Sequence, residues 1–126
     1  MRKILLILSF LISFTPLFAQ KETEQIVQNL QTANFSSLLH YWNAQVALTI
    51  LDQSNQKSNS PEEANQQLQG FFNNKSIVGF EKNAERKVGN TVYITGKLLS
   101  GVIKFNITLL LQETSSGLRI VSVRVS

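Results

Sequence analysis

The segment from Val102 to Glu113 alternates apolar and polar residues more regularly than any other part of the chain. Its apolar parity, meaning the alternate positions that point to one face of a strand, consists of Ile103, Phe105, Ile107, Leu109 and Leu111. A period of two over such a length is typical of a β-strand with one covered face. Shorter segments of the same kind lie at 76–87, 91–99 and 118–125, separated by turns that contain glycine. The second half of the chain therefore predicts a β-meander of four long antiparallel strands, which needs helices to cover its apolar face.

The residues from Ser60 to Asn74 are predicted to form the main covering helix. Ser60 and Glu63 have the spacing of a capping box, and Pro61 suits the first helical position. A single apolar stripe then follows at helical spacing, formed by Ala64, Leu68, Phe71 and Phe72. Gly70 lowers the helix propensity near the end by about 1 kcal/mol. We expect a close approach of Gly70 to the sheet to compensate for this cost.

Two further helices are predicted ahead of this one. Residues 21–33 carry apolar side chains at helical spacing, namely Ile26, Val27, Leu30 and Ala33. Asn34 is expected to end that helix. A short second helix is expected over residues 35–42, with Ser36 or Ser37 as its cap.

The period changes from helical to two at residue 44, which predicts a strand over 44–50. Residues 53–60 contain no apolar side chain and are expected to form a loop. The succession of elements is helix, short helix, strand, helix and four strands. It predicts an α+β domain in which three helices pack on the concave face of one curved antiparallel sheet.

The first twenty residues have the layout of a secretory signal peptide. Two basic residues are followed by an apolar run from Ile4 to Phe14, and Ala19 is small enough for a cleavage position. This run is shorter than the roughly 20 residues that a transmembrane helix needs. We therefore expect residues 1–19 to be removed near Ala19. Residues 20–126 would then form one domain, periplasmic or secreted, with no membrane span.

The composition argues against several classes of function. Removal of Arg2 and Lys3 with the signal lowers the net charge from +4 to +2, which gives no case for nucleic-acid binding. The chain has no cysteine, so disulfides and thiolate chemistry are excluded. One histidine and scattered carboxylates do not make a metal site, and no glycine-rich phosphate loop is present. We expect neither a metal nor a cofactor.

Several segments together are similar to one known family. They are NFSSL at 34–38, VALTI at 46–50, LQGFF at 68–72, YITGKL at 93–98 and the closing strand 118–125. The chain resembles the family called domain of unknown function 4783, found in exported Bacteroidetes proteins. More broadly it resembles the nuclear transport factor 2-like (cystatin-like) cone. The resemblance covers most of residues 22–126 and implies that fold. It implies no activity and no catalytic residues.

A catalytic site has one candidate constellation, formed by His40, Tyr41 and Asp52. His40 is the first candidate for a base, because histidine titrates closest to physiological pH. Isomerases and dehydratases with the same cone place such side chains inside it. However, a histidine at the end of a short helix is ordinarily solvated, and an aspartate that opens a loop is a usual turn residue. The sequence therefore favours a protein that is not an enzyme.

Aromatic side chains give the candidate ligand-binding residues, namely Tyr41, Trp42, Phe72 and Tyr93. Such aromatic rings could line a pocket at the mouth of the cone, but the sequence favours the interpretation that they fill the core. The basic residues of the strands have two interpretations as well: a patch for anionic glycans or lipid headgroups, or the solvated face of a sheet.

The function that the sequence favours is non-catalytic binding at the cell envelope, either of a small apolar ligand or of an envelope protein. The alternative is an isomerase- or dehydratase-like enzyme that uses His40 and Asp52. The last strand adds a further expectation, because Ile120 and Val123 cannot share a face of a regular strand. Either a bulge lies near Ile120, or an apolar strip formed by Val121, Val123 and Val125 lies on the outer sheet face. The strip would support a homodimer.

Overall fold

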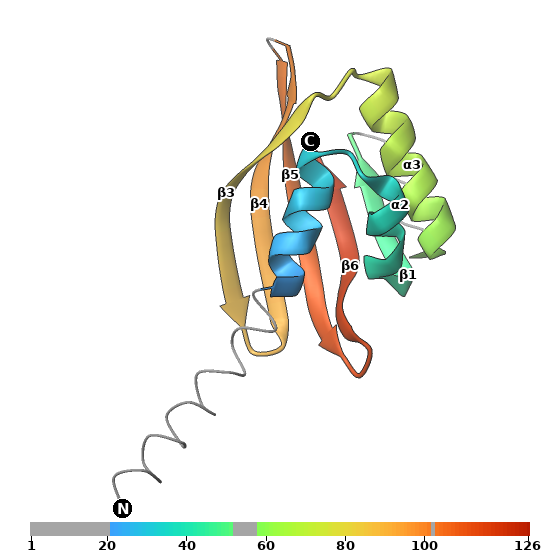
Figure 1. The fold of residues 1–126 in the computed structure, drawn as a ribbon, viewed down its shortest axis with the longest axis vertical. Coiled ribbons are helices and arrows are strands. Elements are labelled where there is room, and N and C mark those ends of the chain that lie inside the picture. The colour runs from blue at the N-terminus through green and yellow to red at the C-terminus, as the bar shows by residue number, and fades with distance from the viewer. Residues whose placement is uncertain (1–20, 52–57, 102) are drawn as a thin grey trace, which may run out of the picture.

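The computed structural model describes residues 21–51, 58–101 and 103–126. The predicted signal peptide and Asp52 lie outside these residues. The chain is helical over 21–31, and Figure 1 shows this N-terminal helix in blue. The following elements are α2 (Phe35–Leu38), a 3-10 turn (Leu39–Tyr41), β1 (Trp42–Ile50), β2 (Ser58–Asn59), α3 (Pro61–Asn74), β3 (Gly79–Val88), β4 (Thr91–Ser100), β5 (Ile103–Thr114) and β6 (Gly117–Val125).

The described strands form one sheet in the order β2-β1-β6-β5-β4-β3. The hairpins from β3 to β6 are antiparallel, as the sequence predicts, but β1 pairs with β6 in parallel. The sheet is therefore mixed, because the β1–β6 pair is parallel. Alternation within a strand shows which side chains share a face, but it carries no information about the direction of a distant partner strand. The direction of β1 was therefore not predictable from its pattern.

The N-terminal helix and α3 lie on the same side of the sheet, and the core fills the space beneath them (Figure 1). The buried side chains of the helices meet the inward parity of the strands, for example Leu109 and Leu111 of β5, which are fully buried. The predicted α+β architecture, with helices on one concave face, is confirmed. We call the opposite side of the sheet its outer face.

The start of α3 has the predicted capping box. The Glu63 N–H donates to the Ser60 hydroxyl at 3.2 Å, and the Ser60 N–H donates to Glu63 Oε1 at 3.2 Å. The prediction for the short helix was wrong in two respects. Asn34 caps α2 by accepting a hydrogen bond from the Ser37 N–H at 3.2 Å, because its short amide side chain reaches the first turn. Trp42 belongs to β1 and not to the helix.

A bulge in β6 decides between the two expectations for the last strand. Leu111 is opposite Ile120 and Leu110 is opposite Ser122, so Val121 is the extra residue. Because of this extra residue, side chains on both sides of the bulge can point into the core. Both Ile120 and Val123 are consequently buried. The expected outer strip is absent, since Val123 and Val125 lie in the core. Self-association through such a strip has therefore lost its structural basis.

Gly96 of β4 lies opposite a second irregularity in the sheet. The register of β3 shifts between Lys82 and Ala84, directly across from Gly96. A Cβ atom on Gly96 would lie 2.4 Å from the Glu81 carbonyl oxygen and 2.6 Å from Cε1 of Phe80. Only a residue without a side chain permits this approach, which lets the Phe80 ring fold over the strand and bends the sheet.

Two other expectations about the core need correction. Gly70 makes no close approach to the sheet, because a Cβ atom there would have nothing within 4 Å. Ile103 was expected on the covered parity, but it is 56% exposed because β5 extends past the end of β6, which stops pairing at Val125 opposite Ile107. The helices cover only the central part of the long hairpin.

Candidate functional site

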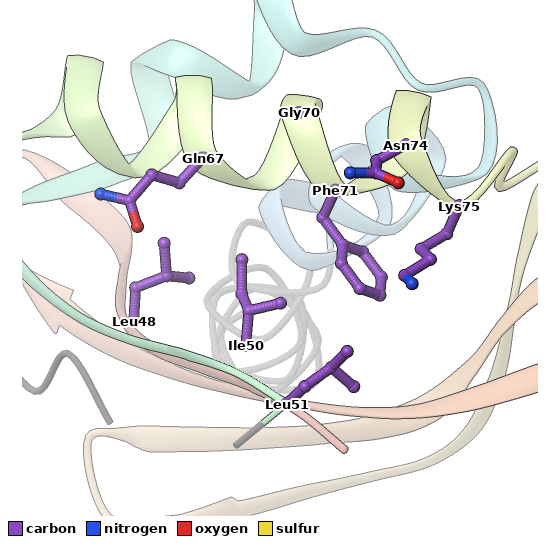
Figure 2. Close-up of a pocket in the computed structure, with 8 residues that line it drawn as sticks. All are labelled: Leu48, Ile50, Leu51, Gln67, Gly70, Phe71, Asn74 and Lys75. Atoms are coloured by element: carbon purple, nitrogen blue, oxygen red, sulfur yellow. The ribbon is translucent and has the colours of Figure 1, made fainter. Parts of the chain in front are cut away.

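A pocket of about 330 Å³ lies between α3 and the end of β1. Its walls are Leu48, Ile50, Leu51, Gln67, Gly70, Phe71, Asn74 and Lys75 (Figure 2). Figure 2 shows Leu48 and Ile50 pointing from the strand toward the helix, while Gln67 and Phe71 point from the helix toward the strand. The volume falls within the range of about 300–1,000 Å³ that is usual for small-molecule pockets.

The local sequence explains why these side chains meet. Leu48 and Ile50 are alternate residues of β1 and so share its inward face. Gln67, Phe71 and Asn74 lie four and three residues apart on α3, which places them along one face of the helix. Gly70 lies in the same region and leaves open space where any other residue would place a side chain.

Leu51 closes the strand side of the pocket in an unusual backbone conformation. Its φ is +55°, in the left-handed region that non-glycine residues adopt rarely, and its N–H donates to the Val125 carbonyl at 2.7 Å. Such a conformation costs on the order of 1–3 kcal/mol and is often found near functional sites. The turn presents the Leu51 side chain, which is 36% exposed, at the edge of the pocket.

The pocket combines an apolar floor with a polar rim. Phe71 is 7% exposed and packs edge-on against Phe105, with ring centroids 5.2 Å apart. Gln67 is fixed by donating its amide N–H to Asn59 Oδ1 at 3.1 Å. Lys75 is exposed at the end of α3, and its ammonium group takes part in none of the ion pairs of the described residues. This arrangement can hold a small apolar body with an anionic group beside Lys75.

The four aromatic residues predicted to bind a ligand are not brought together, and none of them lines this pocket. Trp42 and Phe72 are each 4% exposed and belong to the core. The Tyr41 hydroxyl donates to Gln25 Oε1 of the N-terminal helix. Tyr93 is 42% exposed and lies on the outer face, on the other side of the sheet from Trp42 and Phe72.

Trp42 is tied to α3 by a buried amide that sequence reasoning missed. The indole Nε1–H donates to Asn65 Oδ1 at 3.0 Å, and Asn65 Nδ2 donates to the Phe35 carbonyl at 3.0 Å. Phe72 packs edge-on against Phe35, with ring centroids 5.0 Å apart. The alternative interpretation of these rings, as core, therefore fits Trp42 and Phe72.

The candidate catalytic residues are only partly placed by the structure. His40 is exposed on the 3-10 turn, next to the half-buried Tyr41. Asp52 lies outside the described residues, so the constellation stays a prediction. Within the described ranges, no group of three or more metal-ligating side chains occurs. The same part of the chain contains no helix that is both long and apolar enough to cross a membrane.

Sequence reasoning also missed the polar rim of the pocket. Gln67 and Asn74 were not considered because they lie outside the apolar stripe of α3, and Lys75 follows the end of the helix. The available signal was their spacing relative to Phe71, which places them beside the ring on the helix surface. Their position over β1 depends on a contact between elements that the sequence does not define.

Comparison with known proteins agrees with this architecture. The fold is that of the nuclear transport factor 2-like and cystatin-like proteins. A nuclear transport factor 2-like protein of unknown function from Silicibacter pomeroyi superimposes with a TM-score of 0.60 at 11% identity, over 91% of this chain and 97% of that one. A protein of unknown function with a cystatin-like fold from Xanthomonas campestris gives a TM-score of 0.63 at 16% identity, over 85% and 88%.

The chain belongs to the family described as "Domain of unknown function (DUF4783)", whose model matches residues 23–126. A member of this family from Bacteroides fragilis is similar in structure, with a TM-score of 0.71 at 25% identity over 79% of this chain and 92% of that one. No curated protein matches the chain in sequence. The resemblance drawn from the sequence is thus confirmed, and the family name assigns no activity.

Proposed function

We propose that the domain is a non-catalytic binding module, and that the pocket between α3 and β1 takes a small apolar ligand with a carboxylate or similar anionic group. The observation that carries this proposal is the composition of the pocket. Leu48, Ile50 and Phe71 offer an apolar floor, and Lys75 offers a cation without an ion-pair partner among the described residues. Pockets that combine apolar walls with a few placed polar groups are typical small-molecule sites.

Filling the pocket tests this proposal without disturbing the core. Gly70→Leu would place a side chain into open space and raise the helix propensity, so the fold should be retained. We expect this variant to lose binding of decanoate in isothermal titration calorimetry. Asn73→Leu is the matched control, because Asn73 is an exposed residue of the same helix turn that does not line the pocket.

The anionic group is tested separately at the rim. Lys75→Gln should weaken the binding of decanoate but leave the binding of the uncharged decanol unchanged, because only the carboxylate gains from the ammonium group. Absence of decanoate and decanol binding to the unmodified domain would refute the proposal. Binding that survives Gly70→Leu unchanged would place the ligand elsewhere on the molecule.

We further propose that the domain acts at the cell envelope after export. The support is the signal-peptide layout of residues 1–19, which ends at Ala19. Mass spectrometry of the protein from a secreting host should then find an N-terminus at or within a few residues of Gln20. A product that retains Met1 would contradict this part of the proposal.

A further inference from the structure

The outer face of the sheet carries basic side chains on four neighbouring strands. Arg86 of β3 is opposite Tyr93, Lys97 of β4 is opposite Asn106, Lys104 of β5 is opposite Leu99, and Arg124 of β6 is opposite Thr108. Directly paired residues point to the same side of a sheet, and the alternate positions in the central part of β4 and β5 are buried under the helices. We call Arg86, Lys97, Lys104 and Arg124 the outer basic face.

The ion pairs of the described residues lie elsewhere. Lys82 pairs with Glu85 at 2.9 Å, Lys87 pairs with Glu113 at 2.9 Å, and Arg119 approaches Glu22 at 4.0 Å. None of the four residues of the outer basic face takes part in an ion pair within the described ranges. The register places one acidic residue among them, Glu81, which is opposite Lys97. Lys97 contacts the Asn106 amide oxygen and not this carboxylate.

An exposed aromatic ring lies within this surface. Tyr93 is 42% exposed, and a shallow hollow around it is lined by Ala84, Arg86, Val88 and Thr95. The row through Thr95 continues across the sheet to Thr108 and Arg124, so hydroxyl groups lie between the two arginines. Three strand spacings, about 14 Å, separate β3 from β6, and Arg86 lies two residues along the strands from the row that contains Arg124.

We propose that the outer basic face binds an acidic polysaccharide, a polymer of sugars that carry carboxylates. Arginine side chains accept carboxylates in paired hydrogen bonds, and a tyrosine ring offers an apolar face with a polar end for a sugar ring. The threonine hydroxyls between the arginines can donate to and accept from sugar hydroxyls. The site is independent of the pocket between α3 and β1, since it lies on the other side of the sheet.

A polymer fits this surface better than a lipid bilayer does. The cations are distributed over four strands of a curved sheet, so a flexible chain can follow them while a flat membrane would meet only part of them. The apolar part of the hollow is limited to Ala84, Val88 and the Tyr93 ring, and it lies beside Arg86. A membrane-binding surface would instead be expected to carry a larger group of protruding apolar side chains.

The test is the binding of polygalacturonate to the folded domain, measured by biolayer interferometry, with neutral dextran as the uncharged comparison. We expect binding of polygalacturonate and not of dextran, weakening with added salt because exposed charges are screened. Arg86→Gln with Arg124→Gln should weaken binding by roughly tenfold or more, the equivalent of losing one or two charged hydrogen bonds. Tyr93→Ala should weaken it at constant charge.

The matched control is the double variant Lys82→Gln with Lys87→Gln. It also removes two positive charges, but both come from β3 side chains that are paired with acids. It should bind polygalacturonate almost as well as the unmodified domain. Equal losses in the two double variants would mean that only net charge matters and would overturn the proposal. So would absence of binding, or preferential binding to phosphatidylglycerol vesicles over the polysaccharide.

Discussion

The buried amide of Asn65 offers the most direct test of how α3 is held against the rest of the domain. Asn65 is 9% exposed, and it accepts from Trp42 Nε1 and donates to the Phe35 carbonyl, both at 3.0 Å. Asn65→Ala removes both bonds and leaves the buried Trp42 Nε1–H without a partner, while the Phe35 carbonyl keeps its hydrogen bond from the Leu39 N–H. An orphaned buried donor costs about 1–3 kcal/mol, and the second lost hydrogen bond adds about 0.5–1.5 kcal/mol. Alanine raises the helix propensity by up to about 0.7 kcal/mol, so the expected net loss is roughly 1–4 kcal/mol.

This loss is a large share of the roughly 5–15 kcal/mol that stabilises an ordinary domain. Urea denaturation measures it, and Trp42 is a convenient probe because it is the only tryptophan in the chain. Gln66→Ala is the control, since Gln66 is the exposed neighbour on α3 and should change the unfolding free energy by less than about 0.5 kcal/mol. A loss below about 1 kcal/mol in Asn65→Ala would refute the role assigned to this amide.

Two further substitutions test the sheet. Gly96→Ala should cost about 1–3 kcal/mol of unfolding free energy, because its Cβ would lie 2.4 Å from the Glu81 carbonyl oxygen. Gly79→Ala is the control and should be tolerated, because its Cβ would lie 3.5 Å from Leu99. Chemical denaturation that finds equal effects would contradict the close approach at Gly96. Val123→Lys should cost at least about 3 kcal/mol because it buries a charge in the core, while the half-buried Ser122 should accept lysine with a much smaller loss. A stable Val123→Lys variant would place that side chain on the outer face.

Local chemistry explains which parts of the fold the sequence could predict. The capping box at Ser60 and Glu63 and the alternation of β5 follow from interactions between residues close in sequence. Asn34 was assigned to the end of one helix when it caps the next, because asparagine suits both positions. The exposure of Ile103 could not be predicted in this way. Its place in the alternation of β5 was correctly predicted, but it is exposed because the neighbouring strand β6 is too short to reach it.

The candidate site was harder to predict for a related reason. The inward parity of β1 and the helical spacing of Phe71 were visible in the sequence, but their meeting depends on how α3 crosses the sheet. Trp42 and Phe72 were read as pocket residues because large aromatic rings suit both pockets and cores. The hydrogen bond that holds Trp42 in the core is made to Asn65, a polar residue 23 positions away. No local pattern in the sequence indicates that Asn65 is buried.

The parallel pairing of β1 with β6 has a consequence for the order in which the chain can fold. Leu48 is opposite Val123, and within the part of the chain that the structure describes the other strand partner of β1 is the two-residue β2. The β3–β6 hairpins can form from neighbouring segments, but β1 must wait until β6 is available. Pairing β1 with β6 closes a long loop of chain between them. This costs conformational entropy before the two strands make stabilising contacts, which slows folding. We therefore expect the meander to form first and the β1–β6 pairing to be the late step, so that a chain interrupted before β6 would leave β1 without its main partner.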